Sequence, residues 1–318
     1  MKYSINTMLT FDQAVDGFLL AKRAEQKSPN TLDQYAWAFA KLTDWLGPNA
    51  RFDAITTNQI REFLVSVETL SAKSVHAIQA ALSSLWTWAV AEGYTERHII
   101  RPIPLPRVEE PDIVPLTQNE VRRLLAACDT TRAYHSNRHP DGTTNCRPTA
   151  LRDRAIILFL LDTGIRASEL CALRVRDVNM ETRAVDVVGK GRKRRTVYFA
   201  KRCHQALWRY QVTRQPHLTP DQPLFHVGEV DRPDPFDRCV LSRLLTRIGK
   251  RAEVLPANPH RFRHTFAIEF LRNGGNLFAL QDLLGHTKLE MVRRYARLVQ
   301  ADREAAHKLA SPADNWRL

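Results

Sequence analysis

The amino-acid sequence predicts a mainly α-helical protein with a small β-sheet, in which an N-terminal four-helix bundle precedes a C-terminal α+β domain. Apolar residues recur at the three- and four-residue spacing of amphipathic helices through most of the 318 residues. The alternation typical of strands is confined to residues 173–199. A proline-rich stretch at 101–115 separates two parts, each long enough to bury its own core.

The first part of the chain carries four amphipathic patterns joined by short polar segments. They cover residues 10–25, 31–46, a shorter stretch that begins at 57, and 74–92. Thr10 and Gln13 predict a capping box at the first helix, and Gly47-Pro48 predicts the end of the second. Short connections between four such helices favour a small bundle.

Five prolines recur between residues 101 and 115, with Glu109-Glu110 among them. Alternating prolines favour an extended, semi-stiff chain over a helix, so this stretch is expected to be a linker. We therefore divide the chain into a helical domain at 1–100, a linker at 101–115, a second domain at 116–300 and a polar tail at 301–318.

The second part mixes helices with the predicted sheet. Residues 129–150 are polar and broken, which predicts a surface loop. A helix at 153–162 is apolar nearly all round, so it should be buried, and Gly164 should end it in the left-handed conformation. Strands are expected at 173–175, 184–188 and 196–199, with a basic turn at 189–195. Further helices are expected at 201–213, 238–251, from 258, at 277–284 and after 287.

The charge of the chain is uneven. The formal net charge is +13, and residues from Pro111 onward carry 36 Lys and Arg against 22 Asp and Glu, a net +14. An anion-binding surface is therefore expected mainly on the second part, although a solvated basic surface is the alternative. No apolar stretch approaches the length of a membrane span, and no signal peptide is recognised. The five cysteines, an odd number without C-x-x-C, favour reduced thiols and a cytoplasmic location.

Two patterns resemble metal sites, and neither is favoured. His135, His139 and Cys146 share one polar loop, but no fourth ligand is evident. His260 and His264 have the spacing of a zinc protease helix, yet Arg261 stands where that motif needs glutamate, and Arg263 between them disfavours a dication. We expect His264 to be structural. No metal and no cofactor is predicted.

One set of residues carries the chemistry. It comprises two arginines, two histidines, a lysine and a tyrosine: Arg166, Lys190, His260, Arg263, His286 and Tyr295. Arginine forks bind phosphate in a bidentate manner, and lysine or histidine can move protons near neutral pH. A tyrosine can act as a covalent nucleophile. The set therefore indicates phosphoryl transfer on a phosphodiester without a metal.

The motifs that hold these residues resemble those of the tyrosine recombinases, also called phage integrases or Xer-type recombinases. They are Thr163-Gly-Ile-Arg166 with Ser168-Glu169-Leu170, Gly-Lys190-Gly, His260-x-x-Arg263-His264, Leu-Gly-His286, and Tyr295 nine residues later. The resemblance covers about residues 10–299. It implies that residues 1–100 form the core-binding domain, 116–300 the catalytic domain, and 301–318 a segment that docks on a neighbouring copy. Four polar side chains of the fourth helix would then contact phosphates or bases of DNA, or alternatively they form an ordinary solvated helix face: Lys73, Ser74, His76 and Gln79.

The resemblance also implies a reaction. Tyr295 would attack the scissile phosphate and form a 3′-phosphotyrosyl enzyme, with His260 as the base. Arg166, Arg263 and His286 would stabilise the phosphorane, and Lys190 would protonate the leaving 5′-oxygen. The expected partners are double-stranded DNA with a specific recombination site, further copies of the chain in a tetramer on two sites, and an accessory directionality factor. The cytoplasmic nucleoid is the expected location.

Alternatives follow from the same residues. A type IB topoisomerase would relax any supercoiled DNA, and a non-catalytic DNA-binding protein would never become covalently linked to its site. A metal-dependent nuclease would need clustered carboxylates, which are not found near the motifs. Because the first helix begins almost at the N-terminus, an Xer-like or mobile-element recombinase is favoured over an integrase with an additional arm-binding domain.

The charge distribution predicts that DNA binding depends steeply on salt. If six or more phosphates are contacted, the logarithm of the binding constant should fall with the logarithm of salt concentration at a slope of about −5 or steeper. A gel-shift or fluorescence titration over a range of salt concentrations measures this slope. A flat dependence would argue against an extended basic interface.

Overall fold

The computed structural model describes residues 9–107, 112–130, 134–136, 139–143, 145–189, 193–216, 218–228, 233–285 and 290–299, together with His307 and Ser311. The chain divides into two compact units, Met1–Pro111 and Asp112–Leu318, and the division falls inside the stretch 101–115. Each unit has its own hydrophobic core. Within the described residues, no helix is long and apolar enough to cross a membrane.

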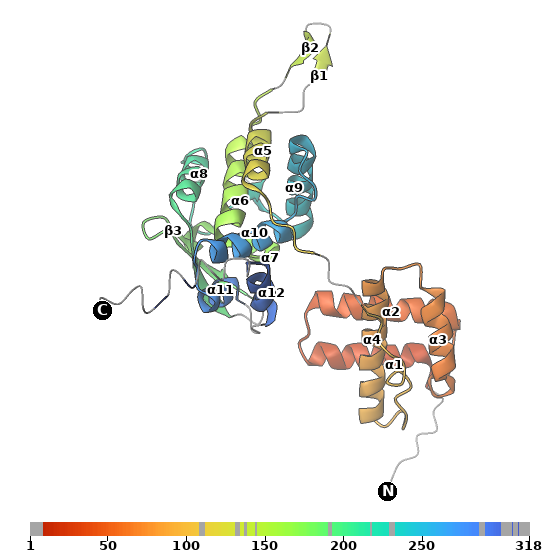
Figure 1. Cartoon of the computed structure of the whole chain (residues 1–318). Helices are drawn as coiled ribbons and strands as arrows, with labels where there is room; N and C mark the ends of the chain where they lie inside the picture. The colour runs from red at the N-terminus through yellow and green to blue at the C-terminus, as the bar shows by residue number, and fades with distance from the viewer. Residues whose placement is uncertain are drawn as a thin grey trace. The chain divides into compact units, whose positions relative to one another are not determined.

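The first unit is a bundle of four helices, α1 (Phe11–Ala24), α2 (Pro29–Leu46), α3 (Thr57–Ser66) and α4 (Ala72–Ala91), with a short turn η1 (Phe52–Ala54) before α3 (Figure 1). The capping box of Thr10 with Gln13 is formed. Helix α2 starts two residues earlier than expected, because Ser28 caps it and Pro29 occupies its first turn. The core is rich in aromatic residues, and Phe52 stacks on Trp86 with ring centroids 4.8 Å apart.

One polar residue of α4 differs from the expectation. Gln79 is 2% exposed, so it does not belong to the solvated face. Its amide donates hydrogen bonds to the carbonyl oxygens of Ile103 (2.8 Å) and Pro104 (3.3 Å). A buried amide needs such partners. Gln79 therefore fastens the start of the linker to the bundle and is not free to meet DNA.

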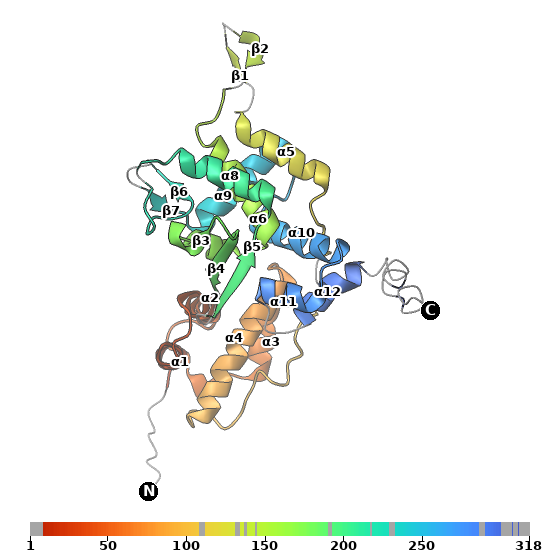
Figure 2. The same cartoon turned by 90° about the vertical axis from the view of Figure 1, so that its left-hand side faces the viewer.

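The second unit is built around the buried helix α6 (Ala150–Thr163), as expected from its apolar sequence. Helix α6 contacts α5 (Gln118–Asp129) and α8 (Lys201–Val212), and it also packs on α10 (Pro259–Arg272). Helix α9 (Arg238–Ala252) lies against α5, and the short α7 (Ala167–Ala172) lies against α9. Helices α11 (Leu277–Leu284) and α12 (Glu290–Val299) pack on α10 around a small core of their own (Figure 2).

The main sheet has three antiparallel strands in the order β3 (Val178–Asn179), β4 (Ala184–Val188) and β5 (Arg194–Tyr198). The strand expected at 173–175 is reduced to one antiparallel bridge, between Arg174 and Pro223, with backbone bonds from Val175 N–H to the carbonyl oxygen of Gln222 (3.0 Å) and from Leu224 N–H to that of Leu173 (2.8 Å). Leu173 ends α7, and the Asp177 carboxylate accepts a hydrogen bond from the backbone N–H of Arg174 (2.8 Å), which turns the chain into the helical turn η2 (Val175–Asp177). A local side-chain bond of this kind competes with strand pairing.

The expectation of a plain loop at 129–150 is corrected in part. Strands β1 (Tyr134–Ser136) and β2 (His139–Thr143) pair as an antiparallel hairpin that projects beyond the end of α5 (Figure 1). Side chains at 131–144 lie outside the described residues, so the positions of His135 and His139 as possible ligands do too. A second small hairpin joins β6 (His226–Val227) to β7 (Asp234–Pro235).

Gly164 lies where α6 ends and the motif of Arg166 begins, and it has the left-handed conformation that was expected (φ +60°). A Cβ atom there would lie 2.2 Å from Cδ1 of Phe266 on α10. Both the backbone conformation and the close approach of α10 therefore require glycine.

We expect Gly164→Ala to lower the free energy of unfolding by about 2–4 kcal/mol, since a left-handed alanine costs about 1–2 kcal/mol and overpacking costs about as much again. Gly274→Ala is the matched control, because Gly274 also has a positive φ (+84°) but has open space around its Cα. Urea unfolding measures both. Equal losses would show that the contact with Phe266 contributes nothing.

Candidate active site

The site forms where the turn after α6, the β4–β5 hairpin, and helices α10 to α12 come together. Arg166 is the N-cap residue of α7, and its side chain is one-third exposed. Its Nη1 donates to Oε1 of Glu169 (3.0 Å), and its backbone N–H donates to Oε2 of the same carboxylate (2.8 Å). Its Nη2 donates more weakly to the carbonyl oxygen of Gly285 (3.4 Å). Arg166 is thus oriented by α7 and by the end of α11.

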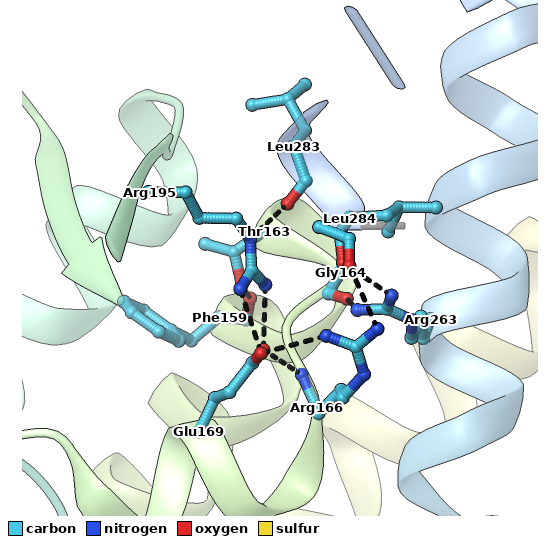
Figure 3. A network of polar contacts seen from close by, with 10 residues as sticks. Phe159, Thr163, Gly164, Arg166, Glu169, Arg195, Arg263, Leu283 and Leu284 are labelled. Atoms are coloured by element: carbon cyan, nitrogen blue, oxygen red, sulfur yellow. Dashed lines mark hydrogen bonds and ion pairs between the residues drawn. The ribbon is translucent and has the colours of Figure 1, made fainter. Parts of the chain in front are cut away.

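Arg263 is held more tightly. It is buried on α10, and it donates to the carbonyl oxygens of Gly164 (2.8 Å) and Leu284 (2.7 Å) (Figure 3). Burial, with the nearby charge of Arg166, lowers the pKa of Arg263 to about 10, so it stays protonated at neutral pH. Two fixed cations therefore lie side by side, which is an arrangement suited to an oxyanion such as phosphate.

Tyr295 comes from α12 and is 5% exposed. Its hydroxyl group lies 2.8 Å from Nδ1 of His264, which stands one turn after His260 on α10. Burial raises the pKa of Tyr295, while the charges of Arg263, Arg294 and Arg166 oppose that shift. Burial also lowers the pKa of His264, and the neighbouring His260, Arg294 and Arg263 lower it further. At neutral pH the pair is therefore a neutral phenol hydrogen-bonded to a neutral imidazole, and the tautomer of the ring decides which of the two donates.

The two remaining residues of the predicted set, Lys190 and His286, lie outside the described residues. Their neighbours in the chain are described. Gly189 closes the β4–β5 hairpin through its N–H, which donates to the carbonyl oxygen of Lys193 (2.8 Å). Gly285 ends α11 in the left-handed conformation (φ +63°). Both glycines lie next to the side chain of Arg195. The residues that directly precede Lys190 and His286 are therefore close together in space.

Comparison with known proteins decides the family. Residues 115–301 match the phage integrase family, and residues 15–93 match the N-terminal SAM-like domain of phage integrases. The chain belongs to the phage integrase family. Its members are tyrosine recombinases, and this chain is a site-specific DNA recombinase.

Relatives of this recombinase match it over half to nearly all of its length. It is similar to a tyrosine recombinase XerC of Mycobacterium sp. (strain JLS), with 29% identity over 307 residues that cover 94% of this chain and 97% of the relative. A XerC of Staphylococcus saprophyticus is 34% identical over 173 residues, which cover 54% of this chain and 58% of that protein.

Solved structures share its fold. XerH recombinase bound to a palindromic difH substrate has a TM-score of 0.66 at 20% identity, covering 96% of this chain and 85% of that one. The Tn1549 transposon integrase has a TM-score of 0.69 at 19% identity, covering 93% and 99%. These matches confirm the predicted fold class, which is a helical N-terminal domain followed by a C-terminal domain of helices and a small sheet.

The structure of this recombinase places four of the six predicted residues, and three of them converge. Arg166, Arg263 and Tyr295 come from separate elements, and their charges act on one another. His260 is exposed on α10, near His264. Among the described residues, no group of three His, Cys, Asp or Glu side chains could hold a metal ion.

Sequence analysis missed the role of two residues. Glu169 was part of a recognised motif but had no assigned function, although its carboxylate bonds Arg166. Arg195 was counted in the basic turn, yet its guanidinium is largely buried against Glu169. The strand alternation carries a signal for this: Arg195 has the same parity as the core residue Val197, whereas Arg194 and Thr196 point outward.

The pair of His264 and Tyr295 leads to a prediction on pH dependence. Because burial depresses the folded-state pKa of His264 below its ordinary value near 6.5, its contribution to stability is present above that value and is lost as the pH falls through the lower, folded-state value. We expect His264→Gln, which keeps a hydrogen-bond acceptor without a titrating group, to lose less stability than the parent protein on acidification.

Urea unfolding from about pH 7.5 to about pH 5, which brackets the ordinary histidine pKa, measures the difference. Tyr295→Phe is the control, because it removes the hydrogen bond and keeps the imidazole. Superimposable pH profiles of the parent protein and His264→Gln would contradict the assignment of a depressed histidine pKa.

Proposed function

We propose that this recombinase cuts and rejoins DNA through a 3′-phosphotyrosyl intermediate formed on Tyr295. The observation that supports this most is the convergence of a buried tyrosine with two arginines that come from distant segments of the chain and are fixed by backbone carbonyl groups. A phenol held beside two cations is suited to attack on a phosphate.

The arginines would bind the scissile phosphate. Arg263 keeps its orientation through two carbonyl oxygens, and Arg166 through Glu169 and, more weakly, Gly285, so little reorganisation is needed when negative charge grows on the phosphorane. His286, which follows Gly285 directly, is proposed as a third donor to the same phosphate.

The proposed cleavage step exchanges one bond at phosphorus and transfers one proton to the protein. The oxygen of Tyr295 forms a bond to phosphorus, the bond from phosphorus to the 5′-oxygen breaks, and the phenolic proton passes to a histidine. His264 Nδ1 already lies within hydrogen-bond distance of that phenol (2.8 Å) and can accept its proton in the tautomer that is protonated on Nε2. His260, four residues earlier and exposed, stays our predicted base on the grounds of the resemblance. Lys190 is proposed to donate the proton that the leaving 5′-oxygen needs.

The rejoining step reverses the cleavage step. A 5′-hydroxyl group from a partner duplex would attack the phosphotyrosyl bond and regenerate Tyr295. The covalent intermediate keeps the phosphodiester energy, so the proposal requires neither ATP nor a metal ion. Four cationic residues of the set (Arg166, Lys190, Arg263 and His286) would do what Mg²⁺ does in other phosphoryl-transfer enzymes.

Double-stranded DNA is the proposed substrate and partner. Similar structures include XerH bound to difH and the Tn1549 integrase in complex with circular intermediate DNA, and the net charge of +14 from Pro111 onward favours a polyanion. Because each chain offers one Tyr295, exchange of two duplexes would need four copies joined cyclically, with the tail at 301–318 as the docking segment. That tail lies outside the described residues except for His307 and Ser311.

We expect covalent capture of DNA that depends on Tyr295. Duplexes with a randomised central segment and a nick in one strand trap the adduct, because the short 5′-hydroxyl fragment diffuses away after cleavage. The parent protein should form an adduct stable in denaturing gels, and Tyr295→Phe should form none, since its side chain has no nucleophilic oxygen.

The matched control is Tyr210→Phe, which changes a buried tyrosine of α8 that is not among the predicted site residues. Adduct formation by Tyr295→Phe at the parent level would contradict the assignment. Capture is carried out in EDTA, and a requirement for added Mg²⁺ would contradict the metal-free mechanism. Relaxation of any supercoiled plasmid without sequence preference would favour the topoisomerase alternative. The DNA sequences recovered from the adduct define a duplex substrate for further experiments.

A further inference from the structure

Arg195 lies at the point where three separate segments of the second unit meet. It is the second residue of β5 and points to the core side of the strand, so that its side chain is only 13% exposed. Its Nη1 and Nη2 donate to the two carboxylate oxygens of Glu169 at 2.8 and 2.7 Å, and its Nε donates to the carbonyl oxygen of Leu283 at 2.7 Å (Figure 3). The guanidinium group therefore joins β5, α7 and α11.

Glu169 is fully occupied by these contacts. Each of its two oxygens accepts one hydrogen bond from Arg195 and one from Arg166, the latter through the side chain on Oε1 and through the backbone on Oε2. A carboxylate has about four lone-pair positions, and all four are used. Burial alone would raise the pKa of Glu169, but the bonds from Arg195 and from the Arg166 backbone hold it below its ordinary value, so the group stays ionised.

Because Glu169 accepts hydrogen bonds from both arginines, Arg195 limits how Arg166 can bind it. Two side-chain N–H groups of Arg195 fill one lone-pair position on each oxygen, so the side chain of Arg166 reaches the carboxylate through Nη1 alone. Arg195 is the more buried of the two arginines, with 13% of its side chain exposed against 34% for Arg166. The outer arginine is thus the one that can face a ligand.

Arg195 also packs against the two glycines that precede Lys190 and His286 in the chain. A Cβ atom on Gly189 would lie 3.4 Å from Nη1 of Arg195, and one on Gly285 would lie 3.2 Å from the same atom. These close approaches bring the hairpin and the end of α11 against one side chain. Loss of the guanidinium would remove this packing and the hydrogen bond to Leu283 at the end of α11.

We propose that Arg195 is a positioning residue for phosphate binding: it occupies half of the Glu169 carboxylate and so keeps Arg166 from pairing with Glu169 through both arms of its fork. This inference rests on the proposed function, in which Arg166 binds the scissile phosphate. Without Arg195, Glu169 is free to take a bidentate bond from Arg166, and the guanidinium turns inward, away from the phosphate.

The test compares Arg195→Gln and Arg195→Lys with Arg152→Gln as a matched control. Arg152, at the start of α6, is also largely buried (14%), shares the buried carboxylate of Asp153 with a second arginine, Arg147, and donates to a backbone carbonyl, that of His226. The opposite end of α6, roughly 20 Å away at 1.5 Å per residue, is the one that contacts Arg263. The control therefore loses a similar buried ion pair without touching the site.

Two readouts are measured on the full chain. The first is the single-turnover rate of adduct formation, at saturating protein, on the duplex recovered by covalent capture. The second is the affinity for inorganic phosphate without DNA, titrated at constant ionic strength. Unfolding curves confirm that each variant is folded, and Arg195→Lys, which keeps the charge but not the fork, covers the case in which Arg195→Gln does not fold.

We expect Arg195→Gln to slow adduct formation at least about tenfold (about 1.4 kcal/mol) and to weaken phosphate binding several-fold. Arg195→Lys should fall between this variant and the parent protein, and Arg152→Gln should match the parent in both readouts. The proposal is overturned if Arg195→Gln, or Arg195→Lys in its place, behaves like Arg152→Gln. If the parent protein captures no duplex, the proposed function fails, and the phosphate titration alone decides the role of Arg195.

Discussion

Three successive carbonyl groups at the C-terminal end of α11 each accept a hydrogen bond from a different arginine. Leu283 bonds Arg195, Leu284 bonds Arg263, and Gly285 bonds Arg166. The last carbonyls of a helix have no partners within it and carry partial negative charge, so cations are stabilised there. The end of α11, together with the carboxylate of Glu169, offsets the repulsion among three neighbouring guanidinium groups. The relative positions of the three arginines depend on these carbonyl groups.

The arginines are charged and bonded to polar groups, whereas the nucleophile lies in an apolar environment. Tyr295 and His264 form a neutral hydrogen-bonded pair in the small core of α10, α11 and α12, where burial opposes charge on either group. The arginines favour the ionised phenol, and burial favours the neutral one. A bound phosphate brings negative charge of its own against the arginines, so the proton of Tyr295 has to leave as the bond to phosphorus forms. A base within hydrogen-bond distance serves that requirement.

Much of the fold could be predicted because its signals are local. The capping box of Thr10 and the left-handed glycine after α6 both act within a few residues. The expected strand at 173–175 is only an isolated bridge, because the carboxylate of Asp177 turns the backbone there and strand propensity does not register such a bond. Gln79 was assigned to the wrong face for a similar reason, since its partners lie in the linker, more than twenty residues away in sequence.

The sequence by itself determined the family and its reaction class, because the motif residues are recognisable from their type and spacing alone. It also determined that Arg263 and Tyr295 lie on helices, since periodicity depends only on near neighbours. Only the tertiary structure decided which histidine contacts the phenol: His260 and His264 share one face of α10, and the position of α12 selects His264. It also decided that one arginine of a basic turn is buried, because the partners of Arg195 on α7 and α11 come from 26 and 88 residues away. Hydrogen bonds over such separations are fixed by how the elements pack, and no local pattern encodes them.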